Sequence, residues 1–326
     1  MAERDLIQQL DQALDGALAA AGPEVNELLR IAGFVRERPN LDFRSRLKNE
    51  LLIRAQKQPH KEMTTMATPT SVNYIREGFR SITPYLHGPR EAGLMDFLKQ
   101  AFGAEELGRY PRPDGSIMHG EVRIGDSVIE LADVPADFPG PKATSLHLYV
   151  EDVDAVYRRA VEAGAISLYE PVNQGYGDRE AGITDPAGNQ WFIATHQGPR
   201  YLPEGLHSVM PGIRAQGASQ YIDFLKRAFG AREFARHESP EGTVVHAKIK
   251  IGDSILETSE AHGPWQPMPG AMHFYVPDVD ETYQQAVAAG AVSLTAPMDQ
   301  PYGERSAGVV DPQGNYWYLA TRTQPM

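Results

Sequence analysis

The chain has 326 residues with 43 acidic and 31 Lys or Arg side chains, and its net charge of −12 disfavours a general nucleic-acid-binding role, which needs a basic face. It contains no cysteine, which excludes disulfides, thiolate metal sites and cysteine nucleophiles. No apolar run approaches the roughly 20 residues of a membrane span, and the charged N-terminus lacks the apolar part of a secretory signal, so a cytoplasmic location without membrane contact is expected.

Residues 1–66 form a segment that occurs once and has helical periodicity. Leu6, Leu10 and Leu14 share one face, and further apolar faces follow around Phe34 and Leu47. Residues 56–72 lack any period and are predicted to be a linker. Two roles are open for the helices: a module for homodimer or partner contact, or a cap packed on the domain that follows.

The rest of the chain is a sequence written twice. MDFLKQAFGAEE (95–106) returns as IDFLKRAFGARE (222–233), and YGDREAGITDPAGNQWFIAT (176–195) returns as YGERSAGVVDPQGNYWYLAT (302–321). The offset of about 127 residues is far longer than the roughly 20–50 residues of a solenoid repeat. A whole domain is therefore duplicated in tandem.

Each copy is predicted to run twice through a strand, a helix and three strands. In the first copy, strand 81–86 and helix 89–103 precede three short strand runs, and then strand 145–150 and helix 153–164 precede three more. Helical and alternating patterns of this kind indicate an α+β fold with mostly antiparallel sheet.

These motifs resemble the vicinal oxygen chelate superfamily, which contains glyoxalase I, bleomycin-resistance proteins and extradiol dioxygenases, and they are most similar to its PhnB-type, glyoxalase-like branch. The resemblance rests on IGDS, LYVEDVDAVYRRAVEAGA and DPAGNQW in the first copy, and on IGDS, FYVPDVDETYQQAVAAGA and DPQGNYW in the second. It implies four βαβββ modules in two cup-shaped, mostly antiparallel sheets. The expected domains are 72–198 and 203–324, each with its own cup.

The resemblance also implies a divalent metal held by first and last strands of the modules, but the ligand positions depart from that pattern. The carboxylate that follows DPxGN in the family is replaced by Phe192 and Tyr318. The first-strand positions, near Ser81 or Thr83 and at Ser145 and Ala271, offer no typical ligand, although His207 lies close in the second copy. Of the family's ligands, only Glu130 and its counterpart Glu257 match, so no standard four-ligand site is expected.

Strand geometry suggests a different group of polar residues. The Gly-Asp turns at 125–126 and 252–253 place Glu121 opposite Glu130 and Lys248 opposite Glu257. Alternation along strands adds the histidines of the same face. The first cup would then hold His119, Glu121, Glu130 and His147, and the second His246, Lys248, Glu257 and His273.

A metal in the first cup would be bound by His119, Glu130 and His147, with Zn²⁺, Ni²⁺, Mn²⁺ or Fe²⁺ as the suitable ions, and binding of no metal at all is the other expectation. The Glu121–Glu130 pair needs a proton or a cation beside it, whereas Lys248 neutralises Glu257. The first cup is therefore predicted to be the working one, with Glu121 and Glu130 as its proton-moving groups.

Further ligand-binding candidates lie around the cups. Tyr149 shares a strand with His147, and Arg179 and Arg305 occupy Gly-containing loops where they would clamp an anion or brace the loop. The proline-rich loops 133–143 and 261–271 differ between the copies and are predicted to form the pocket rims, with Trp265 as a ligand shelf.

Two classes of function are indicated. One is a small-molecule-binding protein similar to bleomycin-resistance proteins, with no chemistry. The alternative is a metal-dependent lyase, isomerase or dioxygenase that acts on a small oxygenated substrate in the first cup, and a purely structural scaffold is the third interpretation. The broken ligand set favours the binding protein.

Overall fold

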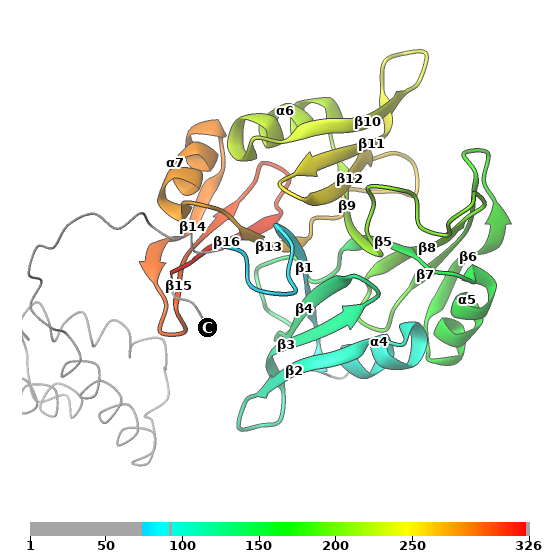
Figure 1. The fold of residues 1–326 in the computed structure, drawn as a ribbon, viewed down its shortest axis with the longest axis horizontal. Coiled ribbons are helices and arrows are strands. Elements are labelled where there is room, and N and C mark those ends of the chain that lie inside the picture. Colours follow the sequence, from blue (N-terminus) through cyan, green and yellow to red (C-terminus); the bar gives the residue numbers. More distant parts are fainter. Residues whose placement is uncertain (1–73, 91–92, 324–326) are drawn as a thin grey trace, which may run out of the picture. The chain divides into compact units, whose positions relative to one another are not determined.

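The computed structural model describes residues 74–90 and 93–323, which lie in one compact unit, Thr70–Met326. The predicted helices of 1–66, and the dimer or partner contact proposed for them, lie outside the described residues. Figure 1 shows the described part as two curved sheets with helices packed against them.

The first repeat contains two βαβββ modules, as predicted. Module 1 consists of β1 (Ile82–Gly88), α4 (Leu94–Phe102), β2 (Glu105–Pro111), β3 (Ile117–Ile124) and β4 (Ser127–Asp133). Module 2 consists of β5 (Ser145–Tyr149), α5 (Val153–Glu162), β6 (Ile166–Asn173), β7 (Asp178–Thr184) and β8 (Gln190–His196).

The second repeat has the same element order. Module 3 consists of β9 (Val209–Ala215), α6 (Ala218–Phe229), β10 (Arg232–Glu238), β11 (Val244–Ile251) and β12 (Ser254–Glu260). Module 4 consists of β13 (Ala271–Tyr275), α7 (Val279–Ala289), β14 (Val292–Asp299), β15 (Glu304–Val310) and β16 (Tyr316–Arg322). The duplication and the α+β class are thereby confirmed.

Each eight-stranded sheet combines modules from both repeats, which corrects the expectation that each repeat forms its own cup. The outer sheet joins modules 4 and 1 in the order β14-β15-β16-β13-β1-β4-β3-β2, and the inner sheet joins modules 3 and 2 in the order β10-β11-β12-β9-β5-β8-β7-β6. Antiparallel pairs β1–β13 and β5–β9 make the two joints. The sequence left this open because all four modules carry similar strand patterns.

The hydrophobic cores, in contrast, follow the repeats. Helices α4 and α5 pack together over modules 1 and 2, and α6 and α7 pack together over modules 3 and 4. The alternating strand residues Leu146 and Leu148 face the first core, and Trp191 and Trp317 are fully buried, as expected of core residues. Each repeat therefore has its own core and lends one module to each sheet.

The face of each sheet that points away from these cores is polar, and the hairpin registers on it are those predicted. Glu121 pairs with Glu130 in the outer sheet, and Lys248 pairs with Glu257 in the inner sheet. Gly125 and Gly252 have φ of +58° in the turns that fix these registers. A Cβ there would also lie within 2.2 Å of a serine oxygen, so both turns require glycine.

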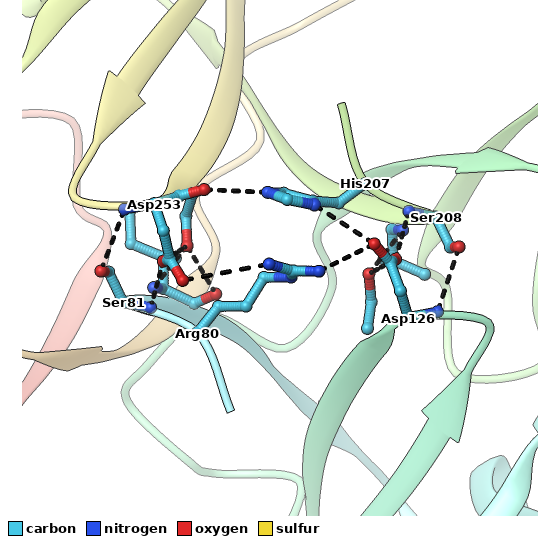
Figure 2. A network of polar contacts seen from close by, with 10 residues as sticks. Arg80, Ser81, Asp126, His207, Ser208 and Asp253 are labelled. Carbon is cyan, nitrogen blue, oxygen red and sulfur yellow. Dashed lines mark hydrogen bonds and ion pairs between the residues drawn. The ribbon is translucent and has the colours of Figure 1, made fainter. Parts of the chain in front are cut away.

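The same two turns connect the sheets to one another (Figure 2). The Asp126 carboxylate accepts hydrogen bonds from the Ser208 amide at 2.8 Å and from Arg80 at 2.8 Å. Asp253 accepts one from the Ser81 amide at 2.8 Å, at the equivalent place. His207 lies between the two turns and contacts Asp126 and the Asp253 carbonyl, so it braces the sheets and is not a pocket ligand.

We predict that an isolated first repeat, residues 70–200, does not form a stable monomer. Without the second repeat, β1 loses β13 and β5 loses β9, so one side of each strand becomes an open edge, which favours pairing with another chain. We expect a dimer in which β1 of one copy pairs with β5 of the other, as measured by light scattering coupled to gel filtration. A monomer that unfolds cooperatively in urea would contradict the interdependence of the repeats.

Candidate ligand site

The polar face of the outer sheet places Glu121 beside Arg76, a residue that precedes β1. The guanidinium donates to both carboxylate oxygens, at 2.5 and 3.0 Å, and the Nε2 atom of His119 lies 3.1 Å from the same carboxylate. Burial would raise the pKa of Glu121, but the hydrogen bonds from His119 and Arg76 lower it. The proton or cation that this acid pair was predicted to need is therefore supplied by the protein itself, through Arg76, and not by a metal.

Glu130 is held by a histidine from the other repeat. The Nδ1 atom of His273 lies 2.9 Å from one oxygen of Glu130, and the His119 Nε2 atom lies 3.9 Å from the other. The sequence-based grouping placed His147 here, and the exchanged modules correct it to His273. Burial opposes protonation of His273, but the Glu130 charge and hydrogen bond raise its pKa overall.

The inner sheet repeats this arrangement with a different cation. Glu257 lies 3.1 Å from His147 Nδ1, 3.5 Å from His246 Nε2 and 3.6 Å from Lys248 Nζ. The attraction between His147 and Glu257 raises the pKa of His147 and holds that of Glu257 well below its usual range. Burial acts against both of these shifts but does not overcome them. His147 Nε2 and Glu257 Oε1 are buried without a hydrogen-bond partner.

Known proteins share both the sequence pattern and this fold. The model of the glyoxalase/bleomycin resistance protein/dioxygenase superfamily matches residues 92–193 and 205–319. The chain belongs to this superfamily.

Some relatives match about a third of this chain, and others match well over half of it. An uncharacterized Mycobacterium bovis protein is 38% identical over 123 residues, which are 35% of this chain and 81% of that protein. A second M. bovis protein, CFP32, described provisionally as a glyoxylase in its name, is 28% identical over 63% of this chain and 80% of its own. Glyoxalase I from Zea mays shares the fold, with a TM-score of 0.55 at 17% identity over 74% of this chain and 92% of its own.

The metal site that is common in this superfamily does not fit the residues present here. Among the described residues, the metal-type donors that gather within 4.8 Å belong to His119, Glu121 and Glu130. Arg76 already occupies the cation's place beside Glu121, and His147 of the predicted metal trio lies in the other sheet. The last-strand positions hold Tyr318 beside His273 and Phe192 beside His147, and neither side chain replaces a carboxylate ligand.

Aromatic rings line both polar faces. Tyr149 stacks on His147 and Tyr275 on His273, each with ring centroids 4.5 Å apart, and their hydroxyls donate to Asp178 and Glu304. Side chains of the predicted rim loops also lie on these faces. The Phe138 ring contacts the Tyr316 ring, and the centroids of the Trp265 and Phe192 rings are 5.7 Å apart. The loops therefore reach the faces that carry the polar groups.

Two predicted ligand residues lie elsewhere. Arg179 donates to both oxygens of Asp154 on α5, and Arg305 does the same to Asp280 on α7. These pairs tie β7 and β15 to the helices. Both arginines therefore brace the strands, which is the second of the two predicted roles, and the anion-clamping role stays a prediction.

Two basic residues of the site were missed from the sequence. Arg76 precedes the repeated motifs, so its reach to Glu121 has no sequence signal. Arg214 lies on β9, where the first repeat has His87, and only this difference between the copies singles it out.

No helix of the described residues is long and apolar enough to cross a membrane.

We predict that the free energy of unfolding falls as the pH rises above about 6.5, the unfolded histidine pKa. The folded pKa values of His147 and His273 are raised, so their contribution is complete below that pH and is lost as pH rises through the folded values. For each histidine, the extra proton held by the folded protein lowers the free energy of unfolding by at most about 1.4 kcal/mol per pH unit.

Urea unfolding between pH 6 and 9 should therefore give a flatter profile for the His147→Gln/His273→Gln double variant than for the wild type. The exposed His262→Gln variant serves as the control and should keep the wild-type profile. An unchanged slope in the double variant would show that the two imidazoles carry no extra proton in the folded protein.

Proposed function

We propose that this protein binds small organic molecules on the polar faces of its two sheets and does so without a resident metal, in the manner implied by the bleomycin-resistance branch of the superfamily. The observation that carries this proposal is the bidentate pair between Arg76 and Glu121. The guanidinium occupies a carboxylate that a metal would need. It does so at the point where metal-type donors of the described residues lie close together.

The remaining carboxylates support the same conclusion. Glu130 is occupied by His273, and Glu257 is surrounded by His147, His246 and Lys248. A Lys ammonium 3.6 Å from a carboxylate competes with a divalent cation through charge repulsion. The polar faces therefore carry preformed ion pairs and aromatic rings. These groups are suited to hydrogen bonding and stacking with an organic ligand.

A metal-dependent lyase, isomerase or dioxygenase is the alternative, and the grouping of His119, Glu121 and Glu130 is the observation in its favour. That activity would require Arg76 to leave Glu121, which breaks two charge-assisted hydrogen bonds. Metal analysis decides between the two. We expect untagged protein to contain substoichiometric Zn, Ni, Mn and Fe, and one tightly held equivalent would favour the enzyme.

We predict that Arg76→Met creates a metal site that the wild type lacks. Without the guanidinium, Glu121 and Glu130 face one another across the strand pair with His119 beside them, and this arrangement favours a divalent cation. Calorimetric titration with Zn²⁺ or Ni²⁺ should give saturable binding to Arg76→Met and none to the wild type.

Arg179→Met is the matched control, because it removes a bidentate guanidinium from a lone carboxylate, Asp154. It should bind no metal. Equal metal binding by wild type and Arg76→Met would mean that Arg76 does not block the site, and the metal-free proposal would be lost.

A further inference from the structure

Arg214 is a buried cation whose described partners are all neutral. Its residue is only 7% exposed. The guanidinium donates to the Gln266 carbonyl at 3.1 Å, to the Gln190 side-chain oxygen at 2.7 Å and to the Met268 sulfur at 3.3 Å. No Asp or Glu of the described residues lies within 4 Å of it, since none of the ion pairs of that part of the chain includes Arg214.

An arrangement of this kind needs a reason. A buried charge normally has an opposite charge beside it, because its desolvation is otherwise uncompensated. Burial lowers the pKa of Arg214, which reflects that cost. The equivalent position in the outer sheet avoids it, because His87 is buried there with its Nδ1 atom 2.9 Å from the Pro141 carbonyl, and burial lowers its pKa.

The surroundings of Arg214 add an apolar shelf to the cation. The guanidinium carbon lies 5.6 Å from the centre of the Trp265 ring, and the Phe192 ring lies 5.7 Å from Trp265. Trp265 belongs to the rim loop 261–271, whereas Phe192 lies on β8 in register with His147. An aromatic wall therefore extends from Arg214 towards His147.

The same face lacks one large side chain of its counterpart and has unused hydrogen-bonding capacity. The residue that pairs with Glu257 is Gly212, whereas the outer sheet places Tyr85 opposite Glu130. Tyr85 uses its hydroxyl on His119 and packs 5.4 Å from Tyr318, so side chains of the protein occupy that position in the outer sheet. In the inner sheet, His147 Nε2 is left without a partner.

We propose that the inner sheet is the binding face for an aromatic carboxylate: the acid group pairs with Arg214, and the ring lies against Trp265 and Phe192. This inference rests on the proposed metal-free binding function and names the class of ligand. It assigns the working face to the inner sheet and reverses the assignment made from the sequence. A carboxylate would supply the missing countercharge, and it would bind the Nη1 group of the guanidinium, which donates to no described residue.

The competing role for Arg214 is a brace for the rim loop, through Gln266 and Met268. The two roles differ in the free protein. A brace stabilises it, so its removal should lower the melting temperature. A cation kept for a ligand contributes little to the free protein, so we expect Arg214→Met to melt within about 3 °C of the wild type.

The test uses benzoate as the probe and benzamide as its neutral isostere, in buffer with EDTA. Trp191 and Trp317 are buried in the cores, so a saturable change in tryptophan fluorescence that disappears in Trp265→Phe places the ligand at the rim loop. Calorimetry then compares wild type, Arg214→Met and Arg112→Met. Arg112 is the matched control, because it also donates to neutral acceptors but lies in the turn after β2, beside the outer sheet.

We expect benzoate to bind the wild type and Arg112→Met equally, and Arg214→Met at least about tenfold more weakly, since a charge-assisted hydrogen-bonded pair is lost. Benzamide should bind more weakly than benzoate to the wild type. Benzoate binding that Arg214→Met leaves unchanged, equal binding of benzamide, or no Trp265-dependent signal would each overturn the ligand assignment. The proposal of metal-free binding has its own test, because one tightly held metal equivalent in the purified protein would contradict it whatever benzoate does.

Discussion

Strand pairing between the two repeats determines where every residue of the candidate site lies. The antiparallel pairs β1–β13 and β5–β9 join modules from different halves of the chain, and the Asp126 and Asp253 turns fix the sheets to one another. As a result, Glu130 faces His273 and Glu257 faces His147, and each imidazole comes from the other repeat. Neither site exists within one repeat.

Neutralisation of these carboxylates is the second constraint, and the two sheets meet it differently. The outer sheet keeps two glutamates in cross-strand register and recruits Arg76 from the chain that precedes β1. The inner sheet replaces one of the two with Lys248, and its equivalent segment needs no arginine. A bidentate guanidinium is a stronger and more directional partner than an ammonium 3.6 Å away. The outer carboxylate therefore has the closer and better-oriented cation.

The parts of this structure that depend on local sequence were predictable. The glycine turns fixed the Glu121–Glu130 and Lys248–Glu257 registers, and strand alternation placed the histidines on the same face. The partner of each module was not predictable, because four modules with similar strand patterns satisfy the same local rules in either pairing. Arg76 was also hidden, because a single arginine in an irregular segment has no spacing that points to its target. Metal binding and the ligand-binding roles stay predictions.

Covalent linkage of the repeats explains why the two faces differ at all. In a symmetric dimer of single repeats, both sites would contain the same residues, so any change would alter both at once. Here, Tyr85 and His87 of one sheet correspond to Gly212 and Arg214 of the other. The outer sheet can thus fill its own face with protein side chains, while the inner sheet keeps a cation that has no acidic partner among the described residues. The outer sheet can then contribute mainly to stability, and the inner sheet can keep the less stable arrangement of the proposed ligand site.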